Sequence, residues 1–297
     1  MGALAARIAA RCAALVDPAV ADFAARLAQE SGALAVLFYG SNLRTGSREG
    51  VLDYYVLLPG AQREKIWPRV SYREWEHGGE VLRAKIATMA LATFGEAARG
   101  ELIDTTIWAR FVQPCALVWK RDEQAAQAVL GALADAAQTA ARLAVALGPD
   151  RGIVEDYWRA LFRATYQAEF RVEQPGREDS ILTVNAAHFD GLLPLALEAQ
   201  GIGFAQDGPV LTPEMAASER SRIEGWWRKR RRLGKPLNIL RLVKASTTFD
   251  GAAGYAAWKI ERHTGVRVEL TPWREKHPVL AAPGVLWRVW RAQKQER

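Results

Sequence analysis

Apolar residues near the start of the chain recur at helical spacing and then gather into short continuous runs. Residues 3–30 place apolar side chains three or four positions apart, with one break, so one or two amphipathic helices are predicted. Residues 33–39 form an apolar run that ends at Gly40-Ser41, which is typical of a buried strand leading into a turn. Residues 51–58 are apolar on both faces except at Asp53, which predicts a strand covered on both sides.

A β-hairpin is predicted next, because Gly78-Gly79 separates residues 72–77 from residues 80–87 and two glycines favour a two-residue turn. In the second strand Arg83 and Lys85 share one face, since side chains two positions apart on a strand point the same way. These two cations are candidates for binding an anion, although a solvated strand face would show the same pattern.

From residue 93 onward the apolar spacing becomes helical. It predicts helices over residues 93–111, 123–147, 153–172, 214–232 and 237–264, with polar connections at 174–180 and 201–213. The best domain boundary is Gly148-Pro149-Asp150. We therefore predict an α+β protein, with a mixed sheet in an N-terminal domain (residues 1–148) and a mainly helical C-terminal domain (residues 149–297).

The overall charge changes this picture by pointing to an anionic partner. The 297 residues carry a net charge of +7, with 49% hydrophobic and 25% charged residues, a balance typical of a folded globular protein. Nucleic acid, nucleotide and anionic lipid all fit the positive charge. No window approaches the about 18 uninterrupted apolar residues of a membrane span. The two cysteines, Cys12 and Cys115, lie far apart in the sequence, and the four histidines show no metal-ligand spacing, so a cytoplasmic protein with free thiols is expected.

The candidate chemistry lies where the two buried strands meet their turns. A strand, a Gly-Ser turn and an Asp on the next strand form the layout of DNA polymerase beta-type nucleotidyltransferases. Gly40 lets the backbone approach a triphosphate, and Ser41 offers an N–H and a hydroxyl to phosphate oxygens. Asp53 is costly to bury unless a cation is bound to it, and magnesium bridging Asp53 and phosphates fits that need. An ordinary turn and an ordinary strand-end Asp remain the alternative, and Tyr55 stands where the fold usually has its second carboxylate.

Several segments, in serial order, resemble the mitochondrial-type phosphatidate cytidylyltransferases (CDP-diacylglycerol synthases), which also carry one Asp on this strand. The similarity runs from about residue 36 to 190, and each motif is loose. The similar segments are Phe38-Tyr39-Gly40-Ser41, Leu52-Asp53-Tyr54-Tyr55-Val56, Glu80-Val81-Leu82-Arg83, Arg110-Phe111-Val112-Gln113-Pro114, Thr165-Tyr166-Gln167-Ala168-Glu169-Phe170-Arg171, and Glu178-Asp179 followed by Val184-Asn185. The sequence departs from the family pattern at Asn42, Gln113 and Glu169, among other positions.

The resemblance implies that a phosphate oxygen of phosphatidate attacks the α-phosphorus of CTP, giving CDP-diacylglycerol and pyrophosphate. It implies that Asp53 holds magnesium, that Arg110 and Arg171 bind anionic oxygens, and that Glu169 contacts a second metal or orients an arginine. The expected nucleotide contacts are Gly40, Ser41, Asn42, Arg83, Lys85 and Tyr166. Two alternatives stay open: a nucleotidyltransferase that modifies RNA or protein, and a degenerate relative that binds nucleotide or lipid without turnover.

Two basic, Trp-containing segments suggest how such a chain reaches a lipid. Trp226-Trp227 leads into five cations at Arg228–Arg232. Residues 286–291 repeat this combination of Trp and cationic residues, with Trp287 and Trp290. Cations beside interfacial Trp side chains suit an anionic membrane surface better than nucleic acid. We expect a peripheral protein on the cytoplasmic, inner face of the membrane.

Overall fold

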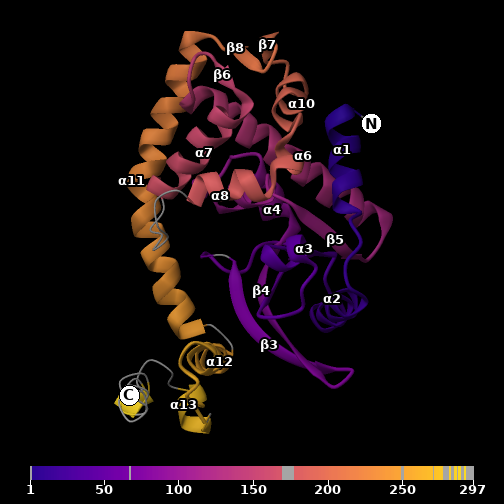
Figure 1. Cartoon of the computed structure of the whole chain (residues 1–297), viewed down its shortest axis with the longest axis vertical. Helices are drawn as coiled ribbons and strands as arrows, with labels where there is room; N and C mark the ends of the chain where they lie inside the picture. The colour runs from indigo at the N-terminus through magenta and orange to yellow at the C-terminus, as the bar shows by residue number, and fades with distance from the viewer. Residues whose placement is uncertain are drawn as a thin grey trace.

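The computed structural model describes residues 2–66, 68–168, 177–248, 251–269 and 271–276, together with Ala281, Gly284, Val285, Trp287, Arg288 and Arg291. It is an α+β structure with a sheet in the N-terminal half and helices in the C-terminal half, as predicted (Figure 1). The first two helices, α1 (Ala3–Cys12) and α2 (Pro18–Ser31), are separated at the predicted break, where Asp17 accepts a hydrogen bond from the Ala19 N–H and caps α2.

The central sheet is mixed and has the strand order β3-β4-β2-β1-β5. The only parallel pair is β2 with β4, and the other three pairs are antiparallel. The predicted strands and the Gly78-Gly79 turn are confirmed, and β3 and β4 extend further than predicted. The strands are β1 (Ala35–Tyr39), β2 (Leu52–Leu58), β3 (Arg69–His77), β4 (Glu80–Ala90) and β5 (Cys115–Lys120).

Each face of the sheet is covered by helices, which explains why β1 and β2 are apolar on both sides. Helix α2 packs on one face, where Phe23 contacts Tyr54 and Trp75. The opposite face packs against α1, α4 (Leu91–Ala98), α5 (Thr106–Phe111) and α6 (Glu123–Leu147). The single helix expected over residues 93–111 is therefore wrong, because the chain breaks between α4 and α5.

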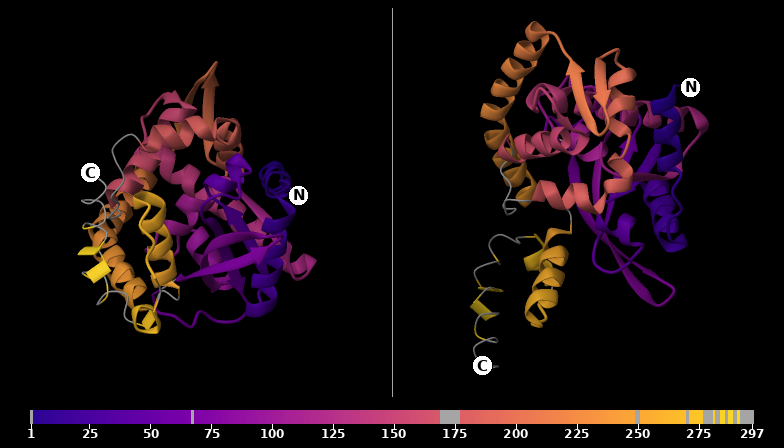
Figure 2. Two further views of the ribbon diagram at one scale, coloured as in Figure 1. Left: turned by 60° about the horizontal axis from the view of Figure 1, so that its bottom comes forward. Right: turned by 45° about the horizontal axis from the view of Figure 1, so that its top comes forward.

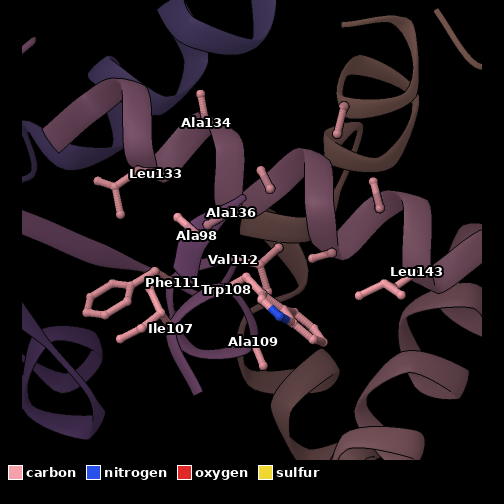
Figure 3. Close-up of a cluster of buried hydrophobic side chains, with 14 of the residues drawn as sticks. Ala98, Ile107, Trp108, Ala109, Phe111, Val112, Leu133, Ala134, Ala136 and Leu143 are labelled. Atoms are coloured by element: carbon pink, nitrogen blue, oxygen red, sulfur yellow. The ribbon is translucent and has the colours of Figure 1, made fainter. Parts of the chain in front are cut away.

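Helix α6 forms the centre of the larger core. The many alanines of α6 have short side chains, so α5 packs closely against it and Trp108 and Ile107 are fully buried (Figure 3). Among the described residues α6 is the one continuous helix long and apolar enough to cross a membrane, but two thirds of that window (67%) is buried inside the protein. This burial is what a core helix of a folded domain shows.

The C-terminal half continues the same core. It adds β6 (Gly152–Ile153), α7 (Val154–Ala168), α8 (Arg177–Val184), α9 (Ala186–Phe189), α10 (Leu192–Glu198), β7 (Gly203–Asp207) and β8 (Val210–Glu214). Trp158 and Phe162 are buried in the core, as their spacing predicts. The predicted connection at 201–213 is instead the β7–β8 hairpin, which pairs with β6. The boundary at Gly148 lies between α6 and α7, whose side chains share one core, and the division into two domains stays a prediction.

The last elements form an arm along one side of the molecule. Helix α11 (Ala217–Thr248) runs the length of that side, and α12 (Ala252–Thr264) and α13 (Pro272–Lys276) follow at its far end, with α12 beside β3 (Figures 1 and 2). Near its beginning α11 packs into the core through Ile223 and Trp227.

The burial of α11 corrects part of the expected membrane surface. Trp227 is 6% exposed and packs against Trp108, with ring centroids 6.3 Å apart. Arg230 is 1% exposed and donates a hydrogen bond to Oγ1 of Thr105 at 3.0 Å. A helix turns by about 100° per residue, so five consecutive cations cannot all face outward. Trp226 is half-buried, Trp287 is exposed, and Trp290 lies outside the described residues.

Candidate functional site

The turn after β1 brings its backbone directly against Asp53. Gly40 has a φ of 90° and precedes the short helix α3 (Ser41–Thr45). A Cβ atom at this position would lie 2.9 Å from Oδ2 of Asp53. Both the left-handed backbone and the close approach therefore require glycine here.

A row of side chains crosses one face of the sheet at this edge. Tyr39 pairs with Asp53, Asp53 with Lys85 and Lys85 with Tyr72, each on the neighbouring strand. Residues opposite one another in a ladder point to the same face, so Asp53 lies between the aromatic Tyr39 and the cationic Lys85. Asp53 is half-buried in this row.

The electrostatics of Asp53 and its neighbours are linked. Burial raises the pKa of Asp53, and the positive charges of Lys85 and Arg110 act against that rise. Loss of surrounding water lowers the pKa of Lys85, although its side chain keeps solvent contact; Asp53 raises it, and Arg110 and Lys259 lower it further. Two cations, Lys85 and Arg110, thus act on one carboxylate, an excess of positive charge that suits an anionic ligand.

A pocket of about 300 Å³ opens on Asp53. Five of the predicted site residues line it: Gly40, Ser41, Asp53, Arg110 and Tyr166. Gln113 and Asn185, both from segments that resemble the cytidylyltransferases, line it too. The other described lining residues are Tyr39, Arg44, Ala109, Pro114, Ser180, Ile181 and Val184. Among these residues Asp53 carries the single carboxylate, whereas Arg44 and Arg110 bring two positive charges.

Arg110 is held at the pocket by the C-terminal end of α5. Its guanidinium lies over the ring of Tyr39, 5.1 Å from the ring centroid. Burial, with Asp53 nearby and Arg110 acting in the opposite direction, raises the pKa of Tyr39 to about 12, so its hydroxyl is neutral at physiological pH. Tyr39 therefore contacts Arg110 through its aromatic ring and does not act as a base.

Three other predicted site residues that the structure describes, Asn42, Arg83 and Lys85, do not line this pocket. Asn42 is buried and donates from its side-chain amide to the carbonyls of Ser47 and Glu49, both at 2.8 Å, so its side chain holds the following loop rather than a nucleotide. Arg83 lies outside the pocket and pairs with Glu74, Nε to Oε1 at 3.4 Å. Glu169 and Arg171 lie outside the described residues.

Sequence reasoning missed Arg44 and the contribution of α12. Arg44 follows Ser41 by three residues on α3, a spacing that puts both on one side of a helical turn, so the signal was present. Lys259, whose charge acts on Lys85, comes from a helix more than 170 positions away in sequence. No local pattern indicates that proximity.

The residues present fit a magnesium ion held mainly by substrate. Among the described residues there is no group of three or more His, Cys, Asp or Glu side chains that could hold a metal. Magnesium commonly uses one or two carboxylates together with phosphate oxygens and water. The missing Cβ of Gly40 leaves Oδ2 of Asp53 open toward the Gly40-Ser41 turn. Tyr55 is buried at the place of a second carboxylate, and its hydroxyl donates to the sulfur of Met89 at 3.2 Å.

Comparison with known protein families finds no match to this chain, and comparison with curated proteins finds none either.

Proposed function

We propose that this protein is a magnesium-dependent cytidylyltransferase that transfers CMP from CTP to a phosphatidate-type lipid. The observation that carries the proposal is the pocket at the end of β1, where a glycine turn, one carboxylate and two arginines face one another.

In this proposal the donor triphosphate lies along the Gly40 turn. Ser41 donates from its N–H and hydroxyl to phosphate oxygens, and Arg44 and Arg110 neutralise their charge. Asp53 would hold the magnesium ion, which, when bound, draws charge from the phosphate oxygens. Aligned donors of this kind stabilise the charge that develops as a phosphoryl bond breaks.

The lone carboxylate favours a phosphate as the acceptor. One of its oxygens forms a bond to the α-phosphorus of CTP, the bond to the bridging oxygen breaks, and pyrophosphate leaves with that electron pair. A phosphate monoester is ionised near neutral pH and needs little help from a base, unlike the hydroxyl of RNA or of a protein side chain. Tyr55, in the position of the second carboxylate, is a buried core residue, and this supports an acceptor that is already an anion.

A second candidate, binding without turnover, is favoured by Lys85. Its ammonium group acts on the same carboxylate that would bind magnesium, so the two cations compete for Asp53. In that case the pocket would bind a nucleotide or an anionic lipid headgroup as a ligand only.

The proposed place of action is the cytoplasmic face of a membrane, with the protein bound peripherally. Arg228, Lys229, Arg231 and Arg232 are exposed on α11 and would contact anionic headgroups.

Pyrophosphate release tests the proposal directly. Purified protein is mixed with magnesium and each nucleoside triphosphate in turn, with and without phosphatidate vesicles. Release that requires both CTP and phosphatidate, and that Asp53→Asn removes, is the expected result. Release with RNA in place of lipid selects an RNA-modifying enzyme. Nucleotide binding without release under any condition selects the second candidate.

A further inference from the structure

Helix α12 carries an unusual stripe on the side that faces the sheet. Tyr255, Trp258, Lys259 and Arg262 follow one another at the spacing of a single helical face. A helix that packs only for stability places aliphatic residues on such a face, but this one places aromatic and cationic residues there.

The stripe lies against the same edge of the sheet as Asp53. Tyr255 contacts the ring of Tyr72 with centroids 5.5 Å apart, and the Arg83 guanidinium lies over Trp258 at 5.7 Å. Nη1 of Arg262 lies 2.9 Å from where a Cβ of Gly50 would be, two residues before β2 begins.

A glycine permits this close docking. Gly251 precedes α12 with a φ of 82°, and a Cβ atom there would lie 2.5 Å from the carbonyl oxygen of Tyr72. Tyr72 is the neighbour of Lys85 in the row that contains Asp53. The helix is therefore fixed to the sheet one strand away from Lys85 and two strands away from Asp53.

Between α12 and the β3–β4 hairpin lies a groove of about 1010 Å³. Arg83 and Trp258 line it, and its remaining lining combines valines, including Val266 and Val268, with further arginines and with Glu74, Glu261 and Glu269. Lys85 and Lys259 do not line the groove but lie beside it. Lys85 follows Arg83 by two residues on the same face of β4, and Lys259 follows Trp258 on α12, with its Nζ 5.7 Å from the ring centroid of Tyr255. An anionic head attached to an apolar chain matches two cations beside a partly apolar groove.

We propose that the groove between α12 and the β3–β4 hairpin binds the acceptor, a phosphate monoester with an apolar tail, and that Lys259 and Lys85 hold its phosphate. This inference rests on the proposed function and assigns the two substrates to opposite sides of Asp53. The nucleotide occupies the pocket with Arg44 and Arg110, and the acceptor enters from the side of Arg83 and Trp258. The ammonium of Lys259 lies over the ring of Tyr255, which contacts Tyr72, the ladder partner of Lys85, so the two lysines lie on the same side of the sheet edge.

The test separates the two substrates kinetically, with dioctanoyl phosphatidate as a water-soluble acceptor. Lys259→Ala is expected to raise the KM for this acceptor about tenfold, on the order of one charge-assisted hydrogen bond, while the KM for CTP stays the same. Arg44→Ala should show the opposite pattern. Arg121→Ala, which removes an exposed cation after β5, is the matched control and should change neither KM.

A second variant tests the docking of α12 without removing a charge. Gly251→Ala places a methyl group against the Tyr72 carbonyl, so α12 should shift and the KM for the acceptor should rise as in Lys259→Ala. If Lys259→Ala changes the KM for CTP instead, or leaves both KM values unchanged, the assignment of the groove is overturned.

Failure of the proposed function has a different signature. If the wild-type protein releases no pyrophosphate, calorimetric titration with dioctanoyl phosphatidate tests whether the groove binds the acceptor, independently of turnover. Binding that weakens about tenfold in Lys259→Ala but not in Arg121→Ala supports it. No binding, or equal binding by all three proteins, overturns it.

Discussion

Lys85 and Asp53 are partners on the parallel strands β4 and β2, so a cation and the carboxylate of the pocket lie side by side on one face of the sheet. The pKa of the acid is raised and the pKa of the base is lowered, chiefly by loss of water. Both changes make the charged forms of Asp53 and Lys85 less favourable. A bound anion and a metal ion would restore them.

The first prediction concerns the pH dependence of Asp53. Activity needs the ionised carboxylate, so turnover should fall with decreasing pH at a pH above 3.8, the ordinary pKa of Asp. Asp53→Asn should lower turnover by about a hundredfold or more. Between the unfolded and the raised folded pKa the native state binds more protons, so ionisation of Asp53 lowers stability as pH rises. The Asn variant, measured by thermal unfolding at neutral pH, should therefore be at least as stable as wild type, and a lower melting temperature would contradict this.

Gly40 and Gly46 form a matched pair for the second prediction. Both have positive φ, but a Cβ atom meets Asp53 only at Gly40 and meets nothing within 4 Å at Gly46. Alanine at Gly46 should cost about 1 kcal/mol of stability because of the left-handed backbone, and alanine at Gly40 should cost more, because its φ of 90° with a ψ of −162° suits glycine almost alone. Only Gly40→Ala should also lower turnover, by about tenfold or more, because it displaces the Asp53 carboxylate. Equal activities in the two variants would mean that the close approach has no role.

Arg110 should act on the reacting anion rather than on stability. Arg110→Lys keeps the charge but loses the planar fork and the contact with Tyr39, so turnover should fall about tenfold. The melting temperature should change little. Arg99→Lys, at a surface ion pair with Glu101, is the control and should keep full turnover. Loss of stability with full turnover in Arg110→Lys would make Arg110 a structural residue.

Within the cation run of α11, position 230 should differ from its neighbours. Arg230→Ser removes a buried hydrogen bond to Thr105 and should lower the free energy of unfolding by about 2 kcal/mol or more. Arg231→Ser, on the exposed side, should change the free energy of unfolding by less than about 0.5 kcal/mol.

Sedimentation with phosphatidate vesicles should weaken in a triple Ser variant at 228, 231 and 232, and further with added salt. Unchanged sedimentation would remove α11 as the membrane contact.

His188 should make the protein sensitive to acid. Burial, with Arg11 and Arg7 nearby, lowers the pKa of His188 to about 4 against the hydrogen bond with the Val112 carbonyl. Below about pH 6.5 the imidazole of His188 binds a proton in the unfolded chain but not in the folded protein, so stability falls as pH drops toward 4. The loss should reach about 3 kcal/mol and should be smaller in His188→Gln. Denaturant unfolding at several pH values measures the difference, and equal slopes in both proteins would contradict it.

The elements predicted correctly are those whose signal is local. The runs before Gly40 and around Asp53, the Gly78-Gly79 turn and the alanine-rich α6 all follow from spacing within a few residues. Strand β5 was not predicted, because its six residues lie between two helices and their pairing with β1 is remote in sequence. The β7–β8 hairpin was missed because its residues are polar and mostly exposed, and Pro213 lies in its second strand.

The site was predicted only as far as one segment could place its own side chains. Gly40, Ser41 and Asp53 follow from two strands that are neighbours in sequence, and Arg110 and Tyr166 from the family resemblance. Asn42 was expected to contact the nucleotide from the family resemblance, and in the structure its side-chain amide donates to the carbonyls of the next loop. Nothing local reveals that α12 lies beside β3, because the intervening chain leaves the core along α11 and returns.

Helix α11 also connects two distant parts of the protein. Its 32 residues span about 48 Å, from the β7–β8 hairpin and the core packing of Trp227 at one end to the chain leading into α12 at the other. Along this length it contacts α6, α7 and β3. A change in how α11 packs on the core would therefore also bear on the strand beside which α12 lies.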